Sequence, residues 1–202
     1  MKTINLSLDH LSYKPIKEVA DSVLKGGVMI YPTDTIYGLG CDIFSKQATA
    51  RISKIKKRSV NKPFSFVCEN IGQISEFAFL SNWGYRLLKR TLPGPYTYIL
   101  EARHANMPKK MLGNRNSVGV RIPDHPICHQ LIKLIGRPIV TTSVNLADDQ
   151  PLTDLSMLSK SFTQQVDIAI DIGPILSDPS TVIDLTGKEP KVIRKGKGDI
   201  PW

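Results

Sequence analysis

The sequence predicts an α/β fold: a single domain over residues 1–202, with a twisted mixed sheet flanked by helices. Three observations indicate this class. Short apolar runs typical of buried strands alternate with segments whose apolar residues recur at helical spacing. Some connections are short enough for hairpins, which favours a mixed sheet over a purely parallel one. A length of 202 residues, 41% of them hydrophobic and 22% charged, suits one globular unit with its own core.

The first elements are bounded by Pro and Gly. A helix is predicted over Pro15 to Lys25, because Pro suits a first helical turn and the Gly26-Gly27 pair ends the apolar pattern. Val28 to Tyr31 is a short apolar run, typical of a buried strand, and Pro32 ends it. The next expected elements are a polar, Gly-rich turn at 33–40, a helix at 47–58, a strand at 64–68, a helix at 83–90 and a strand at 96–101.

The second half continues the alternation. A strand over residues 118–122 precedes a helix over Pro126 to Ile135. A strand at 138–140 then runs into Thr141-Thr142-Ser143-Val144-Asn145, which brings hydroxyl and amide side chains to a strand end, where open α/β sheets bind ligands. The same side chains could instead cap a helix or a turn. Three more strands are predicted, near 166–170, 181–185 and 191–193.

The charge of the chain favours a partner that carries phosphate. There are 27 Lys and Arg residues against 18 Asp and Glu, a formal charge of +9. This excess suits a nucleic acid or a nucleotide, although it also serves plain solubility. The densest cluster is Lys56-Lys57-Arg58, with no acidic residue between Arg51 and Lys62. Its cations could bind phosphate oxygens or complement the carboxyl end of a helix.

The apolar and cysteine patterns of the sequence argue against a membrane-spanning, a secreted or a zinc-stabilised protein. No stretch reaches the roughly 20 apolar residues of a membrane span. Met1 to His10 lacks the apolar region of a secretory signal. Cys41, Cys68 and Cys128 lie far apart without a Cys-x-x-Cys pair, which fits a reducing compartment and no structural zinc. We therefore expect a cytoplasmic protein that uses its cysteines as small buried residues.

Two further features could serve binding. Arg121 ends an otherwise apolar strand, where burying an arginine is costly unless it is paired, either with a bound carboxylate or in a structural ion pair. The loop at 33–40 offers hydroxyls and close backbone approach, but its chemistry alone favours a tight structural loop. His125 and His129 are four residues apart on one predicted helix, yet no third ligand has metal-site spacing, so we expect structural or surface roles.

Six short motifs follow one another along the chain: Pro32-Thr33-Asp34-Thr35-Ile36-Tyr37-Gly38-Leu39-Gly40, Lys56-Lys57-Arg58, Pro93-Gly94-Pro95-Tyr96-Thr97, Val118-Gly119-Val120-Arg121, Ser143-Val144-Asn145 and Ser180-Thr181-Val182-Ile183-Asp184. Any one is common by chance, but six in order are specific. From about Pro15 to Asp199 they resemble the L-threonylcarbamoyl-AMP synthase, or YrdC-like, family, whose first motif is P-T-[ED]-T-x-Y-G-L-G. The tail over residues 192–199 is similar to the YciO-like branch.

The resemblance implies a nucleotidyltransferase. L-threonine, bicarbonate and ATP would give threonylcarbamoyl-AMP and pyrophosphate for the t6A modification of tRNA, with Mg²⁺ accompanying the nucleotide. The fold it implies is a twisted α/β sheet around a basic concave cavity. The partners it implies are the three substrates, proteins of the t6A pathway and RNA, either tRNA or double-stranded RNA, with no membrane.

The resemblance also implies roles for residues, carried over motif by motif. Those expected to bind threonine are Thr33, Arg121, Thr141 and Ser180, with Arg121 on the carboxylate. Those expected to bind ATP are Lys56, Arg58, Ser117, Ser143, Asn145 and Arg194, with Lys56, Arg58 and Arg194 on the phosphates. No catalytic side chain is required, because the carbamate can form from the free amine. The resemblance implies no metal held by the protein itself.

A competing hypothesis keeps the cavity but not the reaction. A YciO-like protein could bind RNA or a nucleotide without significant synthase activity, since Lys and Arg neutralise phosphates whatever the sequence. The uncharged set Thr33, Ser143 and Asn145 separates the two hypotheses. Binding an RNA backbone needs cations, whereas placing ATP beside threonine needs the directional neutral groups as well.

Overall fold

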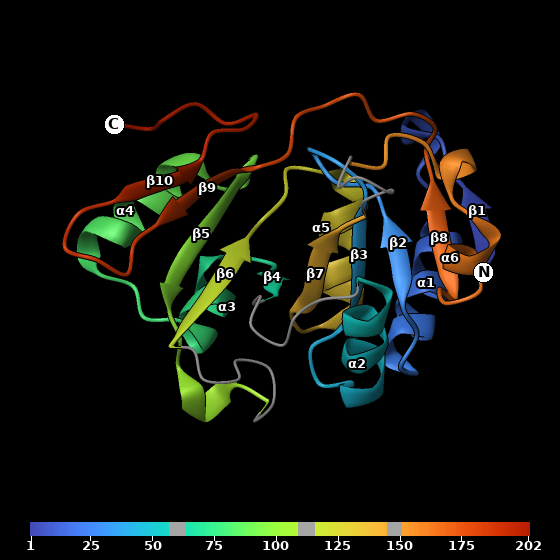
Figure 1. Cartoon of the computed structure of the whole chain (residues 1–202), viewed down its shortest axis with the longest axis horizontal. Coiled ribbons are helices and arrows are strands. Elements are labelled where there is room, and N and C mark those ends of the chain that lie inside the picture. The colour runs from blue at the N-terminus through green and yellow to red at the C-terminus, as the bar shows by residue number, and fades with distance from the viewer. Residues whose placement is uncertain (57–63, 109–115, 145–150) are drawn as a thin grey trace.

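One mixed β-sheet runs the length of the molecule (Figure 1). The computed structural model describes residues 1–56, 64–108, 116–144 and 151–202. Within these residues the sheet has ten strands in the order β1-β8-β2-β3-β7-β4-β6-β5-β9-β10. Their bounds are β1 (Lys2–Asn5), β2 (Met29–Tyr31), β3 (Gly38–Asp42), β4 (Ser65–Val67), β5 (Tyr96–Glu101), β6 (Ser117–Arg121), β7 (Ile139–Ser143), β8 (Ile168–Asp171), β9 (Thr181–Asp184) and β10 (Lys191–Arg194).

Parallel and antiparallel pairs occur in the same sheet. Strand β8 runs parallel to both β1 and β2, β4 is parallel to β6, and β5 is parallel to β9. The pairs β2–β3, β3–β7, β4–β7, β5–β6 and β9–β10 are antiparallel. The predicted mixed sheet is therefore confirmed, and its middle joins strands that lie far apart in the sequence.

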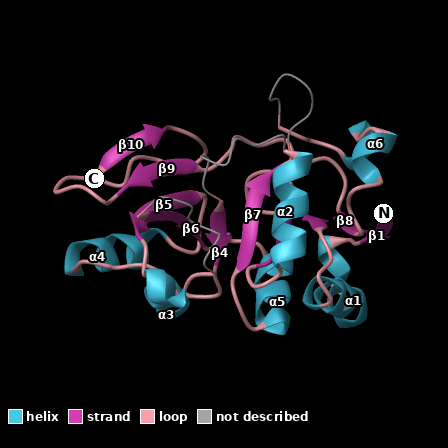
Figure 2. Cartoon of the chain, turned by 60° about the horizontal axis from the view of Figure 1, so that its bottom comes forward, coloured by secondary structure: helices cyan, strands magenta, loops and turns pink. Residues whose placement is uncertain are grey.

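Helices cover both faces of the sheet (Figure 2). Helices α1 (Tyr13–Leu24) and α5 (Pro126–Ile135) pack together on one face, where they bury Met29 and Tyr31 of β2. Helix α2 (Lys46–Ile55) packs on β3 from the other face through Ala48 and Ile52, in the cluster that also buries Ile30. The other helices are α3 (Ile71–Phe77), α4 (Asn82–Thr91) and α6 (Lys160–Thr163). No helix in the described part of the chain is long and apolar enough to cross a bilayer.

Most predicted elements are confirmed. The helix Pro126–Ile135 and the strand Tyr96–Glu101 have the predicted bounds, and most others differ by a residue or two at an end. The strand β1 and the helices α3 and α6 were not predicted. Helix α6 has only four residues, and β1 shows no alternation because its residues are almost all exposed.

The predicted polar turn at 33–40 is corrected at its carboxyl end. Gly38 to Gly40 belong to β3, paired with β2 on one side and β7 on the other. The glycines serve close packing here: a Cβ on Gly38 would lie 2.9 Å from Tyr31 Cε1, and a Cβ on Gly40 would lie 2.9 Å from Ile139 Cγ2. The pattern that resembles a loop is thus a strand that must pass beside a buried tyrosine ring.

Candidate functional site

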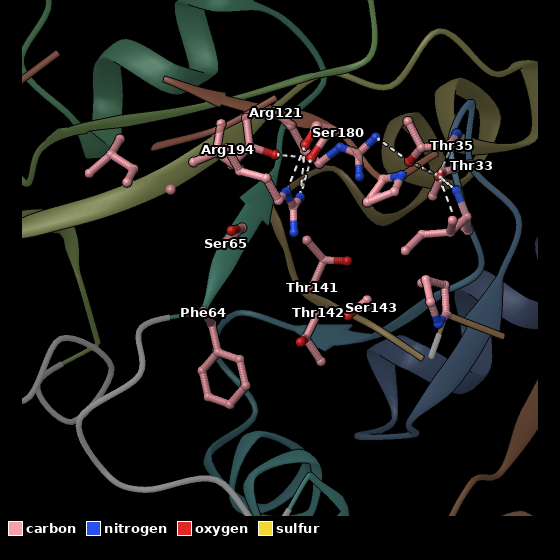
Figure 3. Close-up of a pocket in the computed structure, with 18 of the residues that line it drawn as sticks. Thr33, Thr35, Phe64, Ser65, Arg121, Thr141, Thr142, Ser143, Ser180 and Arg194 are labelled. Atoms are coloured by element: carbon pink, nitrogen blue, oxygen red, sulfur yellow. Dashed lines mark hydrogen bonds between the residues drawn. The ribbon is translucent and has the colours of Figure 1, made fainter. Parts of the chain in front are cut away.

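A cavity of about 820 Å³ opens on the sheet and brings most of the predicted binding residues together (Figure 3). Seven of them line it: Thr33, Ser117, Arg121, Thr141, Ser143, Ser180 and Arg194. Lys56, which follows α2, is not among the lining residues. Arg58 and Asn145 lie outside the described residues. The volume is in the range of pockets that hold small ligands.

Strand alternation supplies the cavity wall. Along β5 and β6 every second residue is buried core, such as Tyr98, Val118 and Val120. The residues between them face the cavity: Thr97 and Ile99 from β5, and Ser117, Gly119 and Arg121 from β6. Because side chains point to opposite faces of a strand in turn, one apolar set builds the core while the polar set builds the site.

A β-bulge aims Arg194 at the cavity. In the β9–β10 pair Val192 is opposite Ile183, but Arg194 is opposite Val182, so Ile193 is one residue too many. Opposite residues of an antiparallel pair share a face, and Val182 lines the cavity whereas Ile183 is buried core. In a regular strand Ile193 would be opposite Val182, and Arg194 would be opposite Thr181 on the other side. The bulge therefore decides which face carries this guanidinium.

Arg121 is held by an ion pair at the edge of the cavity. Its Nη2 donates to Asp34 Oδ1 at 2.7 Å and to Thr35 Oγ1 at 3.1 Å. The two charged side chains are only 10% and 7% exposed. The structural ion pair considered from the sequence is thus present, and it leaves Arg121 Nε buried without a hydrogen-bond partner. Because Arg121 lines the cavity and the loop engages only its Nη2, the guanidinium is also suited to a ligand carboxylate.

Arg194 lies close to Arg121 and is anchored through Ser180. Its Nε and Nη2 donate to the Ser180 carbonyl at 3.2 and 2.8 Å, and Nη2 also reaches the Ser180 hydroxyl at 3.3 Å. That hydroxyl lies 2.8 Å from Thr97 Oγ1. Burial and, second, the charge of Arg121 lower the pKa of Arg194. Two neighbouring guanidiniums that disfavour each other's charge are an arrangement suited to an anion.

Hydroxyl groups line the rest of the wall. Thr141, Thr142 and Ser143 follow one another along β7 (Figure 3), and Thr141 Oγ1 is 2.7 Å from the Tyr31 hydroxyl. The Thr33 hydroxyl serves its own loop: it donates to the Ile36 carbonyl at 2.7 Å and accepts from the Thr35 and Ile36 amides at 3.1 and 3.3 Å. Thr33 therefore holds the loop at the cavity edge through its side chain.

Several lining residues were not predicted. They include Thr35, Phe64, Ser65, Thr97, Asp178 and Asp184. Alternating polar residues in the strand Tyr96–Glu101 are the signal that could have identified Thr97. The described lining has two arginines and two aspartates, so the basic character expected for the cavity stays a prediction, because part of the basic segment lies outside the described residues.

The described residues provide no dedicated metal cage. No group of three or more His, Cys, Asp or Glu side chains among them is placed to hold an ion. Burial lowers the pKa of His125, and His129 Nε2 is 2.8 Å from the Pro123 carbonyl, in keeping with the structural roles expected for both. A Mg²⁺ ion that accompanies a nucleotide needs no such cage, because it usually keeps several waters and binds the phosphate oxygens. The three cysteines are buried, and burial raises the pKa of Cys41 to about 12, which makes the thiol inert.

The fold and the cavity together define an α/β protein with a polar cavity of ligand-binding size on its mixed sheet. Residues 21–196 match the Sua5/YciO/YrdC family, described as "Telomere recombination", and the chain belongs to that family. This agrees with the family identified from its motifs.

Three relatives show how close the likeness is. YciO of Escherichia coli strain K12, itself uncharacterised, is 35% identical over 194 residues, 95% of this chain and 94% of YciO. The crystal structure of E. coli YciO covers 98% of this chain and 96% of its own with a TM-score of 0.89. The threonylcarbamoyl-AMP synthase of Hydrogenovibrio crunogenus is 36% identical over 73% of this chain and 81% of its own. P. abyssi Sua5, crystallised with L-threonine, matches with a TM-score of 0.89 and 30% identity over 97% of this chain and 58% of Sua5.

Proposed function

We propose that this protein is a threonylcarbamoyl-AMP synthase-type nucleotidyltransferase. It would convert L-threonine, bicarbonate and ATP into threonylcarbamoyl-AMP, pyrophosphate and water. The observation that carries the proposal is the Arg121–Arg194 pair at the edge of a hydroxyl-lined cavity. A relative named as such a synthase, and a related Sua5 crystallised with L-threonine, support the same reaction.

The amino acid would bind at the Arg121 end. Arg121, which lines the cavity, would take the threonine carboxylate through the part of its guanidinium that Asp34 and Thr35 leave unengaged. Thr141 and Ser180 would offer hydroxyls beside it, while Thr33 would keep the loop in place. This division of roles gives threonine a charged anchor and directional polar contacts.

The nucleotide would bind across the neighbouring wall. Arg194 would neutralise phosphate charge, and Ser117 and Ser143 would place the nucleotide through hydrogen bonds. Lys56, Arg58 and Asn145 are carried over from the motifs and complete this set. Mg²⁺ would accompany the phosphates and neutralise part of their charge. Phe64 adds an apolar contact to the same cavity.

The chain's contribution to catalysis would be placement and charge neutralisation. The threonine amine adds to CO₂, supplied by bicarbonate with loss of water, and releases a proton. A carbamate oxygen then attacks the α-phosphorus, and pyrophosphate leaves. Both reactants are anions, so Arg121 and Arg194 would lower their repulsion while they are held in contact. A half-enclosed cavity also limits the access of water to a labile carbamate.

The test follows the carbon of bicarbonate into the product. The purified protein is incubated with ¹³C-bicarbonate, ATP, Mg²⁺ and L-threonine, and the adenylates formed are analysed by mass spectrometry. We expect a threonylcarbamoyl adenylate that carries the label and disappears when threonine is omitted. Labelled product with no need for threonine, or no adenylate at all, would contradict the proposal. Delivery of the product to the t6A pathway and its protein partners is proposed on the same basis.

A further inference from the structure

We propose that Asp34 is a positioning residue: it fixes the Arg121 guanidinium so that a donor it does not engage is directed at the carboxylate of the amino-acid substrate. This inference rests on the proposed function and extends it to a residue outside the cavity wall. Arg121 lines the cavity, whereas Asp34 is not among the lining residues. Asp34 would therefore act on the substrate only through Arg121.

The hydrogen bonds determine how the Arg121 guanidinium is oriented. Both of its contacts with the loop use the same nitrogen, Nη2, which donates to Asp34 Oδ1 and to Thr35 Oγ1. A guanidinium is planar and its donors have fixed directions, so holding Nη2 at two points also fixes the direction of the other nitrogens. Nε is buried, which leaves Nη1 as the donor for a ligand in the cavity.

The loop gives Asp34 a fixed place from which to do this. The next residue, Thr35, contributes the second acceptor, and its hydroxyl is 3.0 Å from that of Thr33. From the other direction, Lys197 Nζ donates to the Asp34 carbonyl at 2.5 Å, which ties the loop to the segment after β10. The acceptors for Arg121 thus belong to a loop that is held from within and from the C-terminal segment.

A simpler alternative is that Asp34 only compensates the charge of Arg121, and removing the Asp34 charge distinguishes this role from positioning. If Asp34 were only a counter-charge, removing it would leave Arg121 and Arg194 uncompensated, and an anion would bind more tightly. If Asp34 positions Arg121, removing its charge lets the guanidinium move, and the directed contact with a carboxylate is lost. The two roles predict opposite changes in the apparent affinity for threonine.

The test compares three variants in the threonine-dependent reaction. Asp34→Asn keeps the shape of the side chain and removes its charge. We expect it to raise the KM for threonine on the order of 10- to 100-fold, the scale of a misplaced contact, with the KM for ATP within about twofold. Asp34→Glu, the other residue of the family's motif, should restore most of the loss. Asp42→Asn is the matched control: Asp42 is 5% exposed and pairs with Arg137 at 2.8 Å, and neither residue lines the cavity.

An unchanged or lower KM for threonine in Asp34→Asn, or an equal rise in Asp42→Asn, would overturn the proposal. A crystal structure of Asp34→Asn gives a second readout: the Arg121 guanidinium should leave the position it occupies in the wild-type protein, and its staying in place would also overturn the proposal. If the wild-type protein shows no threonine dependence, the proposed function fails. The Asp34→Asn structure still decides whether Asp34 holds Arg121.

Discussion

A buried arginine is costly unless its donors find acceptors, and Arg121 meets only part of that requirement. Asp34 compensates its charge, but Nε remains buried without a partner. Arg194, in contrast, is anchored on the carbonyl and hydroxyl of Ser180. The place of Arg121 in the cavity lining makes it the candidate for binding a ligand, because Arg51 and Arg137 also have a buried Nε without a partner and do not line this cavity.

Arg121→Lys tests this role without leaving Asp34 as an uncompensated buried charge. Lysine keeps the charge but lacks the planar fork, so the directed contact with threonine should be lost. We expect the KM for threonine to rise roughly 10- to 100-fold, the equivalent of about 1.5–3 kcal/mol, while ATP binding by calorimetry stays close to that of the wild type. A parallel loss of ATP affinity would contradict the assignment of Arg121 to the amino-acid end.

Single residues also show what could be predicted from the sequence. Ser143 and Arg121 were identifiable because polar side chains at strand ends are unusual and costly. Asp178 was not, because it lies outside any strand and joins the cavity only through tertiary folding. The choice between an ion pair and a ligand for Arg121 was equally out of reach, since Asp34 is 87 residues away in the chain.

Among the secondary-structure elements, the edge strand β10 contributes to the site through its β-bulge. The bulge at Ile193 makes Arg194 share a face with Val182, which lines the cavity. A pattern of alternation in the sequence assumes a regular strand, so the facing of Arg194 could not be predicted from it.

Deleting Ile193 should remove the bulge and restore a regular register, in which Arg194 directly follows Val192, stays opposite Val182 and still faces the cavity. We therefore expect this deletion to keep ATP affinity close to that of the wild type, whereas Arg194→Ala should lower it by about 1.5–3 kcal/mol, with the circular dichroism spectrum retained in both variants. A loss of ATP affinity in the deletion variant as large as that in Arg194→Ala would contradict this register.

The close packing of β3 gives a stability prediction. In Gly40→Ala the new Cβ would lie 2.9 Å from Ile139 Cγ2, 3.0 Å from Tyr31 Cε1 and 3.0 Å from the Val140 carbonyl. Relieving these contacts should cost about 1–3 kcal/mol and lower Tm by roughly 3–10 °C in thermal unfolding. Gly187→Ala, whose Cβ would be 3.5 Å from the Glu189 carbonyl, should leave Tm nearly unchanged. Equal Tm values for both variants would refute the packing argument.

Helices and strands were predictable where the spacing of apolar residues agreed with Pro or Gly at their ends. Helix α5 begins at Pro126 and ends at Gly136, which has a φ of +71°, so both limits are marked by residue type. The glycine-rich part of β3 was read as a turn because the sequence does not show the tyrosine ring that it must pass.

Over the whole molecule, the charge of +9 fits a nucleotide site and an RNA surface alike. The two functions differ in whether they need uncharged side chains in the cavity.

Ser143→Ala should impair threonylcarbamoyl-AMP formation and leave any RNA affinity and its salt slope intact, because a neutral contact releases no counterions. Lys89→Ala on the exposed side of α4 should leave threonylcarbamoyl-AMP formation intact and weaken any RNA binding, with a change in the salt slope of at most about one unit. Each variant is measured in RNA titrations at two salt concentrations and in the synthesis assay. Unimpaired threonylcarbamoyl-AMP formation in Ser143→Ala would contradict the nucleotide-binding role of this hydroxyl and leave the RNA-binding hypothesis favoured.

The most direct test of the whole account is pyrophosphate release from ATP by the purified wild-type protein, measured with each substrate omitted in turn. We expect release that requires both L-threonine and bicarbonate and that falls to background when either is left out. We also expect the Arg121→Lys variant to need far more threonine to reach the same rate. No release above background with all substrates present, together with tight RNA binding, would contradict it and identify a family member that uses this cavity for another purpose.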